Sequence, residues 1–392
     1  MNMKQMHRLL WLCSVVVMMM AIGCKHNPED LKVPLANPIV VPDIDTDLLQ
    51  LSDSMLVWLD SVQLDNGLVE TSFASNFVSL YDNALAALVF TQSGQTDRAV
   101  RIFRYFQIRL QTEMLSGNGG YFQFRDAQGQ LQGNRWLGDN AWLLIALNNY
   151  EHTTGDTQFA NVRDALINWI KSQQDADGGL WGGSDISGAH LAKVTEGMID
   201  AFNAVPGYET FHQNLLQYFE AQRWDNTEQL LVSWPGSNYY YALDNFSWGY
   251  CTFEGFPARV LDDATRFENT QLHATSGDSI TGYCFDEDRD AVWMEGTGQM
   301  AVAFSTANRL LDANRVLHEL QKAATSQANF PGAMGLPYAS NVGTGYGGTL
   351  LWNGADITPC TAATTWFIMA CHRFDPMRLN YAKDIPVEDR FW

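Results

Sequence analysis

Six short clusters, each joining a polar side chain to aromatic or glycine neighbours, recur in this 392-residue chain where helices are expected to begin. They are Tyr81-Asp82-Asn83, Gly138-Asp139-Asn140-Ala141-Trp142, Thr195-Glu196-Gly197, Leu243-Asp244-Asn245-Phe246-Ser247-Trp248, Trp293-Met294-Glu295-Gly296 and Gly354-Ala355-Asp356-Ile357-Thr358. The acid advances by 57, 57, 48, 51 and 61 residues from one cluster to the next. This period predicts a repeated supersecondary unit that brings six carboxylates together. Paired carboxyl groups are the groups that cleave glycosidic bonds, one donating a proton and one activating water or attacking the sugar.

Two of these acids, Asp139 and Glu196, are the first candidates for catalysis. Asp139 lies between Trp136 and Trp142, as expected for an acid beside a stacked sugar ring, and Glu196 precedes Gly197, a small residue that would leave room for a substrate. A second set of candidates comprises Asp82, Asp244 and Glu295. The competing interpretation, for each acid taken alone, is a helix cap.

The proton donor among these acids must have a raised pKa. A helix N-terminus favours the ionised carboxylate, so a donor at that position needs burial or a like-charged neighbour. Convergence of the acids supplies the like charges, and the flanking tryptophans supply apolar surroundings. The expected sugar-binding residues are Tyr81, Trp136, Trp142, Trp181, His190, Trp248, Trp293 and Trp352, although a single tryptophan is as readily part of a core.

Helices must position these residues, and two kinds alternate along the chain. Residues 99–110 and 159–170 carry apolar side chains at helical spacing on one face, which is typical of a helix with one solvated side. Residues 84–90, 141–147, 198–205, 300–304 and 362–371 follow the clusters and are apolar on most sides, as in buried helices. The links that precede the clusters are long and rich in Gly, Trp, Tyr and Asp, so they are expected to gather at one end of the molecule, where function usually resides.

Outer and inner helices therefore form pairs, which begin near residues 47, 96, 156, 208, 257 and 312. Six pairs predict an all-α fold, an (α/α)6 toroid over residues 47–392, with an open helical solenoid as the alternative. The fifth pair is the least regular, because Pro257 interrupts its outer helix.

The first 46 residues are interpreted as targeting and tether. Lys4 and Arg8 precede an apolar run that ends in Ala21-Ile22-Gly23-Cys24, which resembles a bacterial lipoprotein signal with Cys24 as the lipidated residue; an ordinary secretory signal is the alternative. Residues 24–46 form a proline-rich tether, so membrane contact is expected through the lipid anchor alone.

Composition limits the partners. Without residues 1–23 the chain keeps 22 Lys and Arg against 44 Asp and Glu, a formal charge of −22 that excludes nucleic acid and disfavours highly anionic glycans. Four cysteines remain, with three possible pairings, and no metal-binding spacing or cofactor motif is present; they are Cys251, Cys284, Cys360 and Cys371. Neither a metal nor a cofactor is expected, and the oligomeric state is left open.

The chain resembles the six-hairpin glycosidases, a large (α/α)6 group of bacterial sugar-cleaving enzymes. The resemblance covers residues 47–374 and rests on the repeat, on residues 81–85, on residues 137–142 and on Gln173-Gln174-Asp175-Ala176-Asp177-Gly178-Gly179-Leu180-Trp181-Gly182. It implies a cleft at the N-terminal ends of the inner helices. Two departures qualify it: the adjacent acids Asp262 and Asp263 fall on an expected outer helix, unlike the paired aspartates of endo-mannanases, and only His190 lies in a mouth loop, unlike the several cavity histidines of sugar epimerases.

The leading hypothesis is an envelope-anchored glycoside hydrolase that acts on an oligo- or polysaccharide without a metal. A carbohydrate-binding lipoprotein that lacks a working acid–base pair is the second hypothesis. A polysaccharide lyase is the third, with Arg125, Arg135, Lys193 and Arg289 as the basic residues that could neutralise a uronate.

Overall fold

The computed structural model describes residues 44–341, 357–378 and 383–392, and these described residues form one compact unit. The expected signal peptide, the lipidation at Cys24, most of the tether, Trp352 and Asp356 lie outside the described residues. Among the residues described, no helix is both long and apolar enough to cross a membrane.

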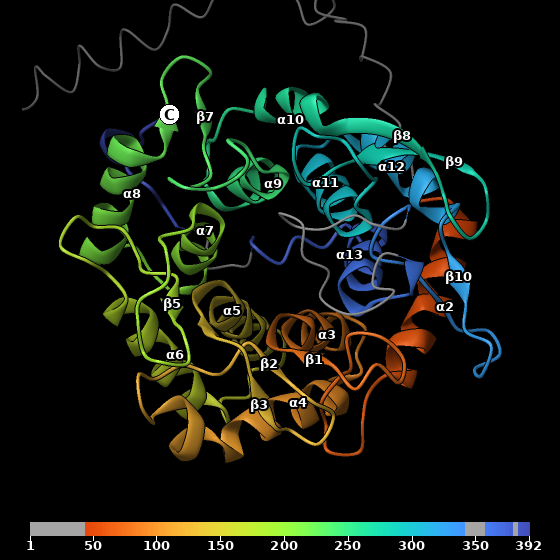
Figure 1. Ribbon diagram of the computed structural model, residues 1–392, viewed down its shortest axis with the longest axis horizontal. Coiled ribbons are helices and arrows are strands. Elements are labelled where there is room, and N and C mark those ends of the chain that lie inside the picture. The colour runs from red at the N-terminus through yellow and green to blue at the C-terminus, as the bar shows by residue number, and fades with distance from the viewer. Residues whose placement is uncertain (1–43, 342–356, 379–382) are drawn as a thin grey trace, which may run out of the picture. The chain divides into compact units, whose positions relative to one another are not determined.

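Two concentric layers of helices form the fold (Figure 1). The inner helices are α3 (Leu80–Gln92), α5 (Leu137–Thr154), α7 (Thr195–Ala204), α9 (Leu243–Thr252), α11 (Met294–Thr306) and α13 (Thr361–Cys371). The outer helices are α2 (Thr46–Ser61), α4 (Thr96–Ile108), α6 (Ala160–Ser172), α8 (Thr210–Gln222), α10 (Val260–Asp263) and α12 (Leu310–Gln321). The inner helices are buried along nearly their whole lengths, whereas α4 and α12 bury one face only, as the two sequence patterns predicted.

The inner helices close into a ring. Each packs against the next in chain order, and α13 packs against both α3 and α2. Ser52 of α2 and His372, just after α13, are linked by a hydrogen bond of 3.3 Å although 320 residues separate them. The (α/α)6 toroid is therefore confirmed, and the open solenoid is excluded.

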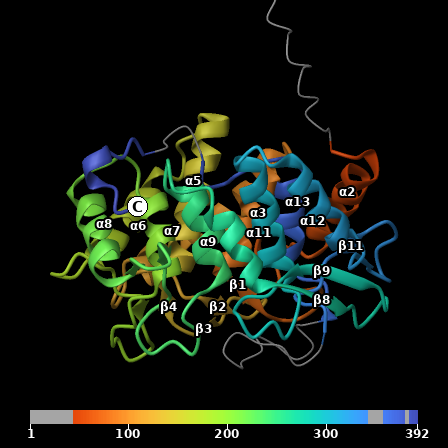
Figure 2. The ribbon, with the colours of Figure 1, turned by 90° about the horizontal axis from the view of Figure 1, so that it is seen from above.

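The long loops gather at one end of the ring and contain small antiparallel sheets (Figures 1 and 2). One sheet joins β1 (Val78–Ser79), β2 (Phe124–Arg125) and β3 (Leu131–Gln132). Two-stranded pairs join β4 (Arg135–Trp136) with β5 (Gly183–Ser184), β6 (Trp224–Asp225) with β7 (Leu230–Leu231), β8 (Glu268–Leu272) with β9 (Ser279–Tyr283), and β10 (Thr325–Ser326) with β11 (Met334–Gly335). The β1–β2–β3 sheet and the β4–β5 pair tie the loops of neighbouring hairpins to one another, whereas each of the other three pairs lies within a single loop.

The fifth hairpin departs most from the repeat. Its outer helix α10 has 4 residues and continues into a 3₁₀ turn, η2 (Ala264–Phe267), before the β8–β9 hairpin. Buried Phe267 packs edge-on against Phe246 of α9, with ring centroids 5.0 Å apart, so the turn replaces the missing helical face. Two further short elements are the π-helical η1 (Leu110–Met114) and the 3₁₀ turn η4 (Val387–Asp389).

The segment that follows α13 crosses the other end of the ring, where the inner helices finish. Thr306 at the end of α11 donates a hydrogen bond of 2.7 Å to the Asp375 carboxylate. Asn203 at the end of α7 donates one of 2.7 Å to the Met377 carbonyl, and Arg378 donates to the Cys251 carbonyl of α9 at 3.2 Å. Three inner helices thus share one short closing segment, residues 375–378.

Candidate active site

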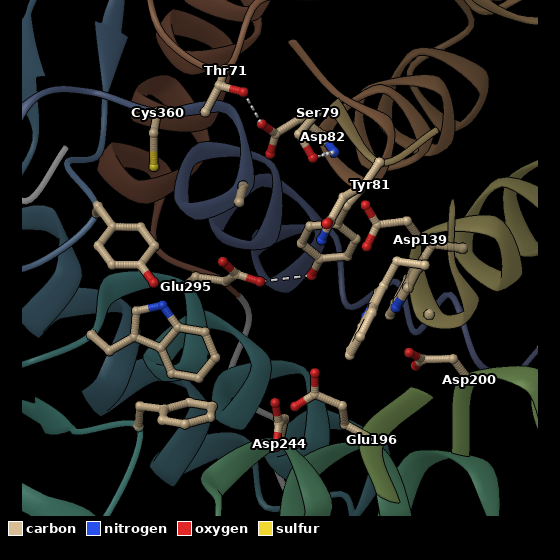
Figure 3. A pocket seen from close by; sticks show the side chains of 18 of the residues that line it. Thr71, Ser79, Tyr81, Asp82, Asp139, Glu196, Asp200, Asp244, Glu295 and Cys360 are labelled. Carbon is tan, nitrogen blue, oxygen red and sulfur yellow. Dashed lines mark hydrogen bonds between the residues drawn. The ribbon is translucent and has the colours of Figure 1, made fainter. Parts of the chain in front are cut away.

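A pocket of about 250 Å³ lies where the inner helices begin (Figure 3). Its size approaches the lower end of the range for small-molecule sites, which is roughly 300–1,000 Å³. The pocket is lined by Thr71, Ser79, Tyr81, Asp82, Gln123, Phe124, Trp136, Gly138, Asp139, Trp142, Glu196, Asp200, Tyr239, Asp244, Trp248, Phe285, Trp293, Glu295, Tyr338, Cys360 and Ala362. All five acids predicted for the site therefore meet in one place, and Asp200 joins them as a sixth.

The five predicted acids do not occupy the helix caps. Each is the second or third residue of its helix, and the cap positions belong to Ser79, Trp136, Val194, Ala242 and Trp293. Only Ser79 makes a side-chain capping bond, accepting from the Asp82 backbone at 3.4 Å. Two buried carboxyl oxygens, Asp139 Oδ2 and Asp244 Oδ1, have no hydrogen-bond partner. The capping interpretation therefore does not account for these side chains.

The asparagine after two of the acids explains why acid and amide recur together. Asn83 accepts from the Val69 backbone N–H at 2.8 Å and donates to the Val69 carbonyl at 3.0 Å. Asn140 makes the same two bonds with Tyr121, at 2.8 and 2.9 Å. Because each amide holds the preceding loop against its own helix, the neighbouring acid is fixed at the rim of the ring and faces the pocket.

Asp82 is buried and receives one strong hydrogen bond. The Thr71 hydroxyl donates to Asp82 Oδ2 at 2.5 Å. Burial raises the pKa of Asp82 to about 7, although the bond from Thr71 opposes this rise. Asp82 therefore changes its charge near neutral pH.

Glu295 lies at the centre of a hydrogen-bonded chain across the ring. Tyr81 donates to Glu295 Oε1 at 2.6 Å, and Gln299, one turn further along α11, donates to the same oxygen at 3.2 Å. The Trp366 indole of α13 in turn donates to the Tyr81 hydroxyl at 2.9 Å. Burial raises the pKa of Glu295 to about 8, against the opposing hydrogen bond from Tyr81.

Asp139 and Asp200 are two buried acids of the pocket whose pKa values are both raised. Burial raises the pKa of Asp139 well above its ordinary value, and the charges of Asp82 and Glu196 raise it further. Burial and the charges of Glu196 and Asp139 likewise raise the pKa of Asp200 well above its ordinary value. Gly138 permits their approach, because a Cβ atom there would lie 3.1 Å from Asp200 Oδ2.

Glu196 of α7 and Asp244 of α9 lie next to each other in the pocket (Figure 3). Burial raises the pKa of both carboxyls. A hydrogen bond between them favours the charged form of Glu196 and the protonated form of Asp244, so Asp244 keeps the proton and Glu196 ionises first. Glu196 is also the one acid of the six that is only half-buried.

Aromatic rings form much of the remaining lining. Buried Trp142 contacts Tyr81 and Trp248 edge-on, with centroids 5.4 and 5.3 Å apart. Phe285 and Trp293 meet at 5.3 Å on another wall. Trp136, Trp142, Trp248, Trp293 and Tyr81 thus line the pocket as the sequence indicated.

Trp181 and His190 are brought together, but not into the pocket. Their rings stack on each other at 5.0 Å and 17°. Lys193 Nζ lies 4.5 Å from the Trp181 ring and pairs with Asp175 and Asp177, each at 2.7 Å. The binding role expected for Trp181 and His190 therefore has no support from their position.

Two other expectations were wrong in detail. The sixth inner helix begins at Thr361 with no acid in its first turn, so the cluster around Asp356 does not mark its start, and Cys360 and Ala362 line the pocket there instead. Gly197 does not make room for a ligand: a Cβ atom there would lie 3.4 Å from the Gly138 backbone nitrogen, so the residue serves the close approach of α7 to α5.

Asp200 was not anticipated, yet the sequence carried a signal for it. It follows Glu196 by four residues and lies in the mostly apolar run of α7, where an acid is out of place. Residues four apart share a helix face, so the pattern already placed both acids on one side of α7.

The charges around the pocket are of one sign. Among the residues that the structure describes, the lining contains six carboxylic acids and no Lys, Arg or His. The two internal stretches outside the description, 342–356 and 379–382, contain none of these basic types in their sequence.

One cluster outside the pocket has ligand atoms close enough to share a metal ion. Cys284, Asp288 and Asp290 place these atoms within 4.8 Å of one another. Both acids are exposed, and the thiol already contacts both carboxylates, at 3.6 and 3.5 Å. All four cysteines of the described region are free thiols, so none of the three pairings is formed.

Comparison with known proteins finds likeness in structure alone. The chain matches no protein-family model and no curated protein sequence. It is similar to a glycosidase solved in complex with glucose, with a TM-score of 0.56 and 13% identity over 84% of this chain and 98% of the other.

Two sugar epimerases show a comparable likeness. An epimerase from a ruminal bacterium has a TM-score of 0.59 at 10% identity, covering 83% of this chain and 97% of its own. The cellobiose 2-epimerase of Spirochaeta thermophila has a TM-score of 0.56 at 13% identity, with the same two coverages, 83% and 97%. The chain therefore has the (α/α)6 toroid fold of the six-hairpin glycosidases and their sugar-epimerase relatives.

Proposed function

We propose that this protein is a glycoside hydrolase in which Asp139 is the general acid and Glu196 the base or nucleophile. The observation that carries the proposal is that these two carboxyl groups of one pocket differ in burial and in how their surroundings affect their pKa values. Asp139 is buried with an unpartnered oxygen, and burial holds its pKa well above the ordinary value. Glu196 is half-buried and is hydrogen-bonded by a neighbour that keeps the proton. Two titratable groups whose environments separate their pKa values are the usual arrangement of an acid and a base.

In the proposed reaction the Asp139 carboxyl gives its proton to the glycosidic oxygen as the bond to the anomeric carbon breaks. Glu196 takes a proton from the water that attacks this carbon, or attacks the carbon itself and is released by water in a second step. The protonated Asp244 carboxyl donates a hydrogen bond to Glu196 and stabilises its ionised form. The rings of Trp136, Trp142 and Trp248 offer apolar faces and edges to the sugar.

The described residues of the pocket support each rival activity less well. A lyase needs a base such as Tyr81, but burial and the Glu295 charge raise the pKa of Tyr81 well above its ordinary range. Epimerisation through cavity histidines is disfavoured, because no histidine lies among the described lining residues. In a protein that only binds carbohydrate, unpartnered buried carboxyl oxygens would lower stability without contributing to catalysis.

The test is hydrolysis of a glycan panel by the purified domain and two amide variants, followed through reducing ends. Asp139→Asn and Glu196→Gln keep the shape of each side chain and remove its proton chemistry. Each is expected to lower kcat/KM by roughly 10²- to 10⁴-fold while retaining binding. Asp262→Asn is the matched control, because Asp262 is an exposed outer-helix acid paired with Arg309.

Full activity in both pocket variants would refute the assignment of these two acids. Unsaturated uronate products would identify a lyase, and isomerised sugar without new reducing ends would identify an epimerase. Loss of turnover in Asp262→Asn would instead point to the adjacent acids on the outer helix.

We also propose that this activity is located at the cell envelope. The support is the sequence pattern at Cys24, which resembles a lipoprotein signal. Cys24→Ser is expected to move the protein from the membrane fraction to the soluble fraction, and unchanged membrane association would contradict the anchor.

A further inference from the structure

A row of aromatic rings leads from the pocket to the surface of the molecule. Trp293, directly before α11, packs edge-on against Phe285, with ring centroids 5.3 Å apart. Phe285 in turn contacts Tyr239 at 4.9 Å, and Tyr239 contacts Trp234 at 5.5 Å. The first three rings line the pocket, whereas Trp234 is not among the lining residues and is only half-buried. The row therefore continues past the pocket along one side.

The turn that carries the outer end of this row, residues 234–239, is anchored beside Glu196. The hydroxyl of Thr195, the residue before Glu196, lies within hydrogen-bonding distance of the two backbone carbonyls that precede the turn. The Ser233 N–H donates to the Tyr240 carbonyl at 2.9 Å and closes the turn at its base. Because one anchor is the chain neighbour of Glu196, the turn is held at a fixed place relative to that carboxyl group.

Tyr239 connects the acids of the pocket to the outer ring. Burial raises the pKa of Tyr239 above its ordinary value, and the charges of Glu196 and Asp244 raise it further. The phenol therefore lies in the electric field of both carboxyl groups, while its ring contacts Trp234. A sugar held beside Glu196 would have Tyr239 next to it and Trp234 in the direction of the surface.

A partly exposed indole beside the pocket is suited to a second sugar. The pocket itself, at about 250 Å³, lies below the usual range of small-molecule sites, roughly 300–1,000 Å³, so a longer glycan must extend past its lining. A tryptophan ring offers a large, rigid apolar face at such a position. Trp234 lies on the segment anchored to α7, where the next sugar of a chain would come.

We propose that Trp234 forms an outer subsite, which binds the sugar linked to the one held in the pocket. This inference rests on the proposed hydrolase function and adds a residue that determines specificity. With this subsite, the enzyme prefers glycans of two or more sugars to glycosides of a single sugar.

The first test compares substrates of two lengths. The purified protein and its variants are assayed with the methyl glycosides of glucose, mannose and xylose and with the corresponding trisaccharides. In the series that is cleaved, Trp234→Ala is expected to lower kcat/KM for the trisaccharide roughly 3- to 10-fold more than for the methyl glycoside, because one aromatic contact is lost. Trp234→Tyr keeps an aromatic ring and should retain most of the preference for length.

Trp181→Ala is the matched control, because Trp181 belongs to another loop at the same end of the ring and stacks on His190 outside the pocket. It should show the same preference for length as the unmodified protein. Equal losses for the two substrates in Trp234→Ala would overturn the subsite, and so would a preference that disappears in Trp181→Ala but persists in Trp234→Ala.

A binding measurement separates this inference from the activity on which it rests. In isothermal titration calorimetry, Asp139→Asn should bind the trisaccharide more tightly than the methyl glycoside, and addition of Trp234→Ala should remove most of that difference. Equal affinities of Asp139→Asn for the two glycans would overturn the outer subsite even where glycans are cleaved. If the unmodified protein cleaves no glycan, the hydrolase proposal fails, and the two affinities still decide whether the subsite exists.

Discussion

Substitution of Glu295 by glutamine should remove part of the pH dependence of folding stability. Glu295 is buried on α11 and accepts hydrogen bonds from Tyr81 and Gln299. Glutamine keeps the size of the side chain and an oxygen that accepts from Tyr81, but it cannot take up a charge. The variant therefore isolates the free energy needed to ionise this carboxyl inside the protein.

The magnitude follows from the pKa. Burial moves the pKa of Glu295 from 4.5 to about 8. At 1.36 kcal/mol per pH unit, a difference of about 3.5 corresponds to about 5 kcal/mol at full titration. Because the folded pKa is raised, the unfolded chain releases its proton first as pH rises. The contribution to stability is therefore complete below pH 4.5 and is lost progressively up to about pH 8.

The assay is urea unfolding of both proteins at a series of pH values from the ordinary pKa of glutamate to well above the raised one. The unmodified protein should lose stability over this interval by up to about 5 kcal/mol more than Glu295→Gln. Glu220→Gln, which changes an exposed glutamate of α8, is the matched control and should follow the unmodified protein. Parallel pH profiles for the unmodified protein and Glu295→Gln would refute the reasoning.

Three further changes test other parts of the structure. Tyr81→Phe removes a bond to a charged acceptor worth about 1.5–3 kcal/mol, so the upper limit of the Glu295 pH transition should rise by about 1–2 pH units; an unmoved limit in the unfolding series would contradict this. Glu113→Gln leaves the guanidinium of Arg125 buried without its partner at 3.0 Å, and urea unfolding should show a loss of about 3–5 kcal/mol, whereas a loss under about 1 kcal/mol would count against it. Trp392→Ala removes a ring that packs against Phe253, the residue after α9, and should lower the free energy of unfolding by about 2 kcal/mol with kcat/KM unchanged. A fall in kcat/KM would show that this C-terminal segment supports the pocket.

The two helical layers could be predicted because the outer helices have one face in water, whereas the inner helices are surrounded by protein. An outer helix such as α4 must show a period of 3.6, since one face contacts water, and an inner helix such as α5 cannot, since all its sides are buried. The same logic located Asp82, Asp139, Glu196, Asp244 and Glu295 at one rim, because every inner helix begins at the same end. Their catalytic roles stay a prediction.

The loops were less predictable, because their course depends on contacts between distant segments. Trp136 lines the pocket since β4 pairs it with Gly183, and the same crossing leaves Trp181 outside, stacked on His190. No local pattern distinguishes Trp136 from Trp181. The fifth hairpin shows the same limit, because the 3₁₀ turn that ends at Phe267 substitutes for an outer helix only once Phe246 is in place.

The closing of the ring has a consequence for the order in which the protein folds. Contacts within one hairpin join residues near in sequence and form early, whereas the contact of Ser52 with His372 spans 320 residues and must wait for loop closure. The bond between Asn203 and the Met377 carbonyl spans 174 residues and belongs to the same late step. Because the acids come from five hairpins, they meet only when the ring closes. A folding intermediate with all its helices would thus lack the acid-lined pocket, and recovery of ligand binding should lag behind recovery of helical circular dichroism during refolding.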